Sequence, residues 1–107
     1  MAVQFIDLDT LERLDELIAE SHTRPVFVFK HSSSCGISHD VLSQMEILDH
    51  EVHVIVVQES RAISNAVEQK LGTRHASPQA FVLRDGKPVY HATHYGIDPN
   101  EILKHLQ

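Results

Sequence analysis

The only cysteine of the 107-residue chain, Cys35, lies between a run typical of a β-strand and a run typical of a helix. An ionised thiol is a nucleophile, so a lone cysteine at such a junction is the first candidate for chemistry. A helix that begins after Cys35 would point unpaired backbone N–H groups and the positive end of its dipole at the sulfur, which favours the thiolate. Serines and a glycine flank Cys35, as in an exposed turn. We therefore predict a reactive thiol; the alternative is a small, buried and inert cysteine.

The apolar pattern predicts the elements that position this thiol. Strands are expected at residues 5–8, 25–30, 52–57, 79–84 and 88–93, where β-branched and aromatic residues cluster. Helices are expected after a cap at Asp9, over about 36–48, from Ser60 to Gly72, and after Asp98. Asp85-Gly86 predicts a tight hairpin turn between the last two strands. The order is βαβαβα-ββα, an α/β protein with a mixed five-stranded sheet and four helices in a single domain, residues 1–107.

Composition excludes several classes of partner. The net charge of −6 argues against nucleic acid and anionic membranes, because both need a basic surface. The N-terminal residues have neither a basic start nor a long apolar run, and one cysteine cannot form an internal disulfide, so we expect a cytoplasmic protein. The nine histidines show no ligand spacing, so no metal site is predicted.

Several short segments on the predicted cysteine side fit one family. They are Lys30-His31-Ser32, Cys35-x-Ile37-Ser38, Val57-Gln58-Glu59, Arg61, Ser64-Asn65, His75, Ser77-Pro78-Gln79-Ala80-Phe81, His91-Ala92 and His94. On these residues the chain resembles thioredoxin-like proteins over its whole length, and more narrowly the YtxJ-type monothiol bacilliredoxins of the bacillithiol system. It departs from that family at Gly36, where proline is usual, and at Tyr95-Gly96, where Trp-Asn is common.

The resemblance implies a thioredoxin-like fold in which a cis proline, here Pro78 after Ser77, faces the cysteine. It also implies that Ser38 occupies the place of the second cysteine of a dithiol enzyme, so the resolving thiol must come from outside. That thiol would be bacillithiol, a cysteine joined to glucosamine and malate, acting as a co-substrate, with no bound cofactor. The implied reaction is the removal of bacillithiol from bacillithiolated cytosolic proteins by Cys35, and we expect a monomer.

The catalytic candidates are Cys35 and Ser38, because a hydroxyl one turn into the helix could donate to the thiolate; a solvated helix serine is the alternative. Lys30 and His31 could stabilise the thiolate by charge, or be ordinary loop or packing residues. The substrate-binding candidates are Ser34, Gly36, Arg61, Arg74, His75, Ser77, Pro78, His94 and Tyr95. Arg61 or Arg74 would pair with the malate carboxylates, unless both are solvated surface arginines, and the backbone of Ser77 would pair with an extended substrate.

Two other functions fit a single thiol on this fold. One is an iron–sulfur cluster carrier of the monothiol-glutaredoxin type, which holds a [2Fe–2S] centre between two chains. The other is a non-catalytic thioredoxin-like binding module in which Cys35 is unreactive.

Overall fold

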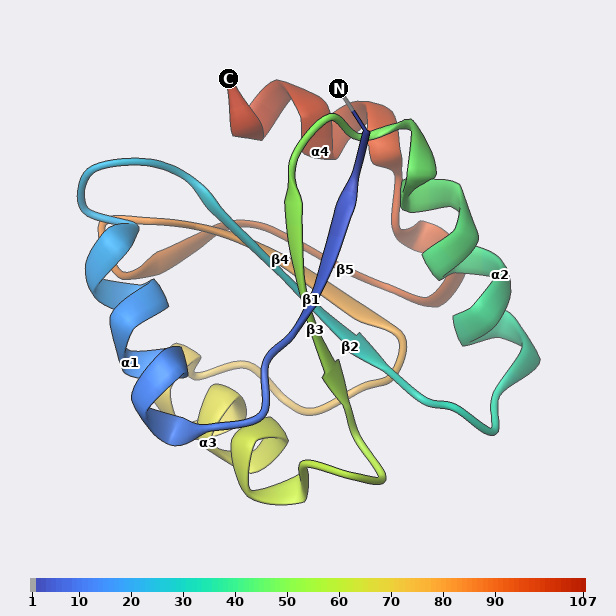
Figure 1. Ribbon diagram of the computed structural model, residues 1–107, viewed down its shortest axis with the longest axis horizontal. Coiled ribbons are helices and arrows are strands. Elements are labelled where there is room, and N and C mark those ends of the chain that lie inside the picture. The colour runs from blue at the N-terminus through green and yellow to red at the C-terminus, as the bar shows by residue number, and fades with distance from the viewer. Residues whose placement is uncertain (1) are drawn as a thin grey trace.

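The computed structural model describes residues 2–107 and shows a twisted five-stranded sheet with helices on both faces (Figure 1). The strands are β1 (Gln4–Asp7), β2 (Val26–His31), β3 (Glu51–Val56), β4 (Gln79–Arg84) and β5 (Lys87–Thr93). The helices are α1 (Leu11–Glu20), α2 (Gly36–Gln44), α3 (Arg61–Leu71) and α4 (Pro99–Leu106), with 3₁₀ turns η1 (Met45–Ile47) and η2 (His94–Gly96). This order confirms the predicted βαβαβα-ββα pattern.

The sheet has the strand order β1-β3-β2-β4-β5. β1 and β2 both run parallel to β3, while β4 is antiparallel to β2 and to β5. Asp85 and Gly86 have φ values of 54° and 75°, the positive pair that a tight two-residue hairpin turn requires. The predicted mixed sheet is therefore confirmed, with β2 at its centre.

Every residue of β2 is buried, and its side chains belong alternately to two separate hydrophobic cores, one on each face of the sheet. Phe27 and Phe29 pack against α2 and α4, while Val26 and Val28 pack on the other face against α1 and α3. A strand turns successive side chains to opposite faces. The last two residues of β2 therefore diverge: Lys30 points toward α3 and His31 toward α2.

Two helix boundaries differ from the prediction. The N-cap of α1 is Thr10 rather than Asp9, because the Thr10 hydroxyl accepts the N–H of Arg13 at 3.1 Å. Leu11 therefore lies in the first turn of the helix, where it is 47% exposed. The second helix ends at Gln44 and continues only as a 3₁₀ turn, which still buries Met45.

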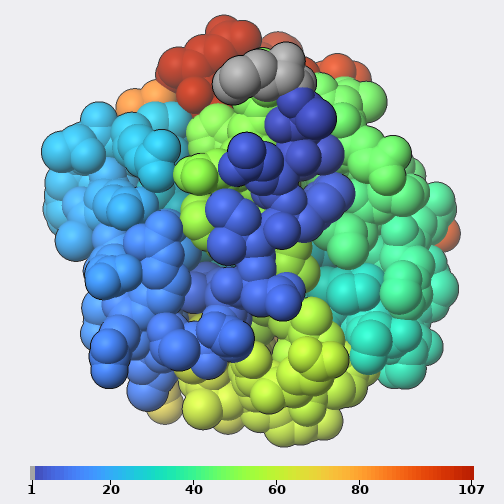
Figure 2. Space-filling view, viewed as in Figure 1, coloured from blue at the N-terminus to red at the C-terminus, as the bar shows by residue number. Residues whose placement is uncertain are grey.

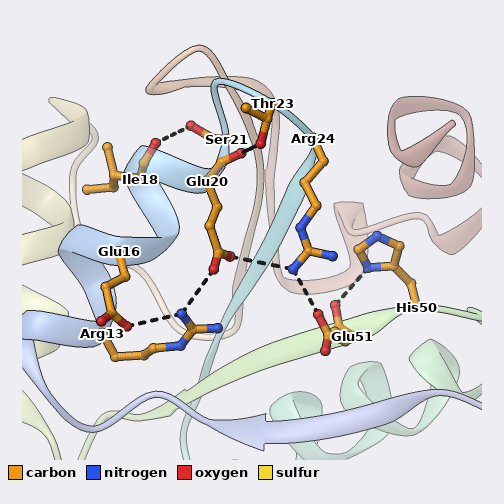
Figure 3. A network of polar contacts seen from close by, with 9 residues as sticks. All are labelled: Arg13, Glu16, Ile18, Glu20, Ser21, Thr23, Arg24, His50 and Glu51. Carbon is orange, nitrogen blue, oxygen red and sulfur yellow. Dashed lines mark hydrogen bonds and ion pairs between the residues drawn. The ribbon is translucent and has the colours of Figure 1, made fainter.

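An ion-pair network ties the end of α1 to the start of β3 (Figure 3). Glu20 bridges Arg13 at 3.2 Å and Arg24 at 3.5 Å, and Arg24 continues to Glu51 at 3.2 Å. The network lies at the end of the sheet where β2 and β3 begin. Cys35 follows the opposite end of β2, so these charges brace the scaffold without entering the thiol site.

β1 is an edge strand, and Figure 2 shows the N-terminal segment lying across the surface between the parts of the chain that contain α1 and α2. It pairs only with β3 among the strands. Across residues 2–107, none of the helices has both the length and the apolar character needed to cross a membrane.

Candidate active site

Cys35 is the N-cap residue of α2 and is partly exposed. Its backbone is extended (φ −111°, ψ 119°), its N–H donates to Ser32 O at 3.3 Å, and its C=O accepts the N–H of His39 at 3.2 Å. The sulfur itself makes no capping hydrogen bond. The helix terminus therefore holds the backbone of Cys35 in place and leaves the thiol available to a partner.

The side chain of Gln58 fixes the loop that leads to Cys35. Its Oε1 accepts the N–H of Ser33 at 3.1 Å, and its Nε2 donates to the hydroxyls of Ser32 and Ser34 at 2.7 and 3.0 Å. From α2, His39 Nε2–H donates to Ser33 O at 2.8 Å. Ser34, a predicted substrate contact, is thus exposed but already bonded to Gln58. The loop is held from two elements, which limits the motion of the adjacent thiol.

Ser38 is fully buried beneath this loop. Its Oγ accepts the N–H of Ser32 at 3.0 Å and lies 2.7 Å from His31 Nδ1. Burial and the nearby His39 lower the pKa of His31 below its ordinary 6.5, so His31 is neutral at pH 7. His31 therefore does not supply the positive charge that the sequence suggested. The contacts of Ser38 brace the thiol loop and are made with His31 and Ser32 rather than with Cys35.

The Ser77–Pro78 peptide bond is cis, as the family resemblance implied. Pro78 is buried, and its C=O accepts the N–H of His94 at 3.0 Å. Among the described residues, the N–H and C=O of Ser77 have no hydrogen-bond partner, and its buried Oγ has none either. Ser77 therefore offers an unused backbone edge for an extended peptide or a small ligand.

The first residues of η2 connect the cis-proline loop to the thiol. His94 adopts a positive φ of 52°, and the next residue, Tyr95, is 63% exposed. Partial desolvation, the charge and hydrogen bond of Asp40, and the charge of Cys35 raise the pKa of Tyr95. Tyr95 thus stays a neutral phenol, and it directly follows His94, whose N–H is bonded to Pro78 O.

The basic residues of this side lie over α3 and the loop that follows it. Arg61 and Arg74 are exposed, and within the part of the chain that the structure describes neither guanidinium has an ion-pair partner. Burial and the charge of Lys30 lower the pKa of His75, and the charge of Arg61 contributes less. Arg74 is held by its backbone, since its C=O accepts Gln79 Nε2 at 2.9 Å.

Gln58 was expected on the cysteine side but its contacts with the thiol loop were not predicted, and the parts played by His39 and Asp40 were not predicted at all. Gln58 and His39 fix the thiol loop, and Asp40 raises the pKa of Tyr95. Gln58 carried a signal, because it directly follows the third strand at the edge where Cys35 was expected. His39 and Asp40 carried no such signal, since polar residues at these helix positions are typical of a solvated helix face. Gly36 is exposed at the first position of α2, and a Cβ built there would meet no atom within 4 Å.

No group of three or more histidine, cysteine, aspartate or glutamate side chains within residues 2–107 is arranged to hold a metal ion.

Comparison with known proteins agrees with this geometry. A sequence profile described as monothiol bacilliredoxin BrxC matches residues 6–102. The chain belongs to the monothiol bacilliredoxin family. A solved structure described as an oxidoreductase candidate with a thioredoxin fold is 28% identical, with a TM-score of 0.86 over 96% of this chain and 94% of that one.

Thioredoxins share the same fold at lower identity. That of Schistosoma mansoni is 16% identical (TM-score 0.74, covering 97% of this chain and 99% of that one), and that of Fasciola hepatica is 19% identical (TM-score 0.75, covering 95% and 99%). The predicted family, the thioredoxin-like fold and the enzyme class are confirmed: this bacilliredoxin-family chain is a thiol-disulfide oxidoreductase.

Proposed function

We propose that this bacilliredoxin removes bacillithiol from bacillithiolated proteins through Cys35, in the cytoplasm and as a monomer. The observation that supports the proposal most is the placement of one partly exposed thiol at the start of α2, with a buried serine where a dithiol enzyme has its second cysteine. With no second cysteine in the chain, an external thiol must complete each cycle.

The proposed reaction balances in two exchanges. The Cys35 thiolate attacks the bacillithiol sulfur of the protein–bacillithiol disulfide, a new sulfur–sulfur bond forms, and the protein thiolate leaves and takes up a proton. A bacillithiol thiolate then attacks the bacillithiol sulfur on Cys35 and releases the Cys35 thiolate. The net products are a protein thiol and oxidised bacillithiol, whose two sulfurs carry the disulfide that the protein lost.

Recognition of the malate part would come from the unpaired basic side chains. Arg61 and Arg74 are exposed and free of ion pairs with the described residues, and arginine pairs carboxylates in bidentate fashion. The other substrate contacts that we propose come from the thiol loop, the cis-proline loop and η2. They are Ser34, Gly36, His75, Ser77, Pro78, His94 and Tyr95.

The activity is tested with a bacillithiolated peptide and free bacillithiol, following release of the peptide thiol by mass spectrometry. Wild type should release it, Cys35→Ala should not, and Ser43→Ala, on the exposed side of α2, should match wild type. A glutathionylated copy of the peptide should react more slowly. Equal rates for Cys35→Ala and wild type would overturn the proposal.

The malate contact has its own test. Arg61→Met or Arg74→Met should raise the KM for the bacillithiolated peptide by about tenfold, as expected when a hydrogen-bonded charge pair is lost. Neither should change the reaction with a small uncharged disulfide. Arg84→Met is the matched control, because Arg84 bonds Gln107 O at the other end of β4. Unchanged KM in both variants would show that malate is bound elsewhere.

A further inference from the structure

A lysine side chain is fully buried behind the cis-proline loop. Lys30 is 0% exposed, although lysine is almost never buried unless it is paired with an opposite charge. No carboxylate within residues 2–107 lies in ion-pair contact with it. Its Nζ instead donates to Ser64 O at 2.9 Å and lies 3.1 Å from Nδ1 of His75. A buried cation aimed at an imidazole calls for an explanation beyond packing.

The chemistry of an ammonium group decides the protonation state of that imidazole. An ammonium has N–H donors and no acceptor, so His75 Nδ1 must be the acceptor in this contact. The hydroxyl of Ser64, 3.3 Å from the same nitrogen, can donate to it as well. A proton on Nδ1 would place donor against donor and charge against charge. His75 is therefore neutral and carries its proton on Nε2.

The rest of His75 is also fixed. Its backbone N–H donates to Glu68 Oε1 at 2.6 Å, and the residue is exposed to solvent. His75 precedes the cis Pro78 by three positions, in the loop that joins α3 to β4. With its backbone N–H and Nδ1 both engaged, Nε2–H is the donor that this residue has left for a ligand.

We infer that Lys30 is a positioning residue that holds His75 as the Nε2–H tautomer, so that the cis-proline loop presents a neutral donor to a carboxylate of the thiol substrate. Only the identity of that substrate rests on the proposed function. The charged groups that face the pair are Glu68 and Arg61, both on α3. Because burial, Lys30 and Arg61 lower the pKa of His75, the ring does not gain a second proton near neutral pH.

The tautomer is measured without any substrate, by long-range ¹H–¹⁵N correlation spectra of the histidine rings. At pH 7 wild type should show His75 as a neutral ring protonated on Nε2. In Lys30→Met the pKa of His75 should rise toward 6.5 and an Nδ1–H fraction should appear, whereas Lys30→Arg, which keeps a donor-only cation, should resemble wild type. Lys104→Met, an exposed lysine on α4, is the control.

A wild-type His75 protonated on Nδ1 at pH 7, or ring spectra unchanged in Lys30→Met, would overturn the inference. If Lys30→Met fails to fold, the wild-type spectrum alone decides. The proposed contact between His75 and the substrate is tested by comparing His75→Phe with His75→Gln, whose amide retains an N–H donor. The KM for the bacillithiolated peptide should rise about tenfold in the phenylalanine variant and less in the glutamine variant, as expected for one hydrogen bond to a charged group.

Equal KM in the two His75 variants would overturn the substrate contact. Alkylation of Cys35 by iodoacetamide should proceed at the same rate in Lys30→Met and wild type, which separates a binding effect from a change in the thiol. If wild type fails to release bacillithiol at all, the proposed function fails, while the ring spectra still decide the tautomer.

Discussion

Replacing the buried Lys30 by methionine should change how the stability of the protein depends on pH. Burial lowers the pKa of Lys30 from 10.5 to about 8, against a smaller opposing effect of Glu68. Between these two values the unfolded chain binds the lysine proton and the folded protein does not. Unfolding free energy therefore rises as the pH increases from about 8 to 10.5, because the cost of burying the charge disappears.

The size of the effect follows from that shift. Lowering the pKa from 10.5 to about 8 corresponds to about 3 kcal/mol, present as a cost below pH 8. Methionine fills a similar volume without the charge. It would leave Ser64 O within the hydrogen-bonding pattern of α3 and would leave His75 Nδ1 with the Ser64 hydroxyl. We expect Lys30→Met to be at least as stable as wild type at pH 7, by up to about 3 kcal/mol.

Urea denaturation of both proteins from pH 7 to 10.5 measures this directly. The difference between the two unfolding free energies should shrink as the pH rises, since groups common to both proteins cancel. Lys104→Met, which removes an exposed lysine, should run parallel to wild type. A Lys30→Met variant that is several kcal/mol less stable at pH 7, with a constant difference across the range, would show that burying the Lys30 charge does not cost stability.

Three further predictions concern other parts of the fold. Ser38→Ala should lower the unfolding free energy by about 1–3 kcal/mol in urea denaturation, because Ser32 N–H loses its buried partner, while Ser43→Ala should not. Burial lowers the pKa of His53, so below pH 6.5 the unfolded chain binds a proton at this residue more readily than the folded protein, and stability falls. His53→Leu should therefore lose less stability than wild type between pH 7 and pH 5, as measured by thermal unfolding. Gly36→Pro should raise stability by about 0.4–1 kcal/mol, because proline suits the first helical position and a Cβ at residue 36 meets no atom within 4 Å.

Each of these three predictions has a result that would show it to be wrong. A Ser38→Ala variant as stable as wild type would mean that water replaces the hydroxyl. If His53→Leu loses as much stability between pH 7 and pH 5 as wild type does, other groups cause that loss. The same follows if His22→Leu, a change at an exposed histidine, has the same effect as His53→Leu. Destabilisation by Gly36→Pro would show that the Gly36 N–H is needed, for example by the thiol loop.

The order of elements could be predicted from the sequence because each one carries its own local signal. The Asp85-Gly86 turn demands positive φ, and Asp98-Pro99 caps α4 with Asn100 N–H bonded to the aspartate at 2.9 Å. The first helix shows where such signals become ambiguous. Asp9 and Thr10 are both good N-caps, and the structure shows that Thr10 caps the helix, with an extended backbone (φ −131°, ψ 148°) and its hydroxyl bonded to Arg13 N–H.

The site was less predictable, because its contacts join residues far apart in the chain. The sequence predicted the position of Cys35. The hydrogen bond between Gln58 and Ser33 in the thiol loop, however, joins residues 25 positions apart in the sequence, and the Lys30–His75 contact joins residues 45 positions apart. Lys30 was expected near the thiol as a charge. Strand alternation turns it to the opposite face of the sheet from His31, toward α3, where it acts on the cis-proline loop instead.

The most direct test of the central claim is the transfer of one bacillithiol group to Cys35 without free bacillithiol present. A bacillithiolated protein is mixed with an equal amount of this chain, quenched in acid, and both intact masses are recorded. The substrate should lose one bacillithiol and this chain should gain it at Cys35, with no transfer to Cys35→Ala. A substrate that keeps its adduct, or transfer that persists in Cys35→Ala, would contradict the account.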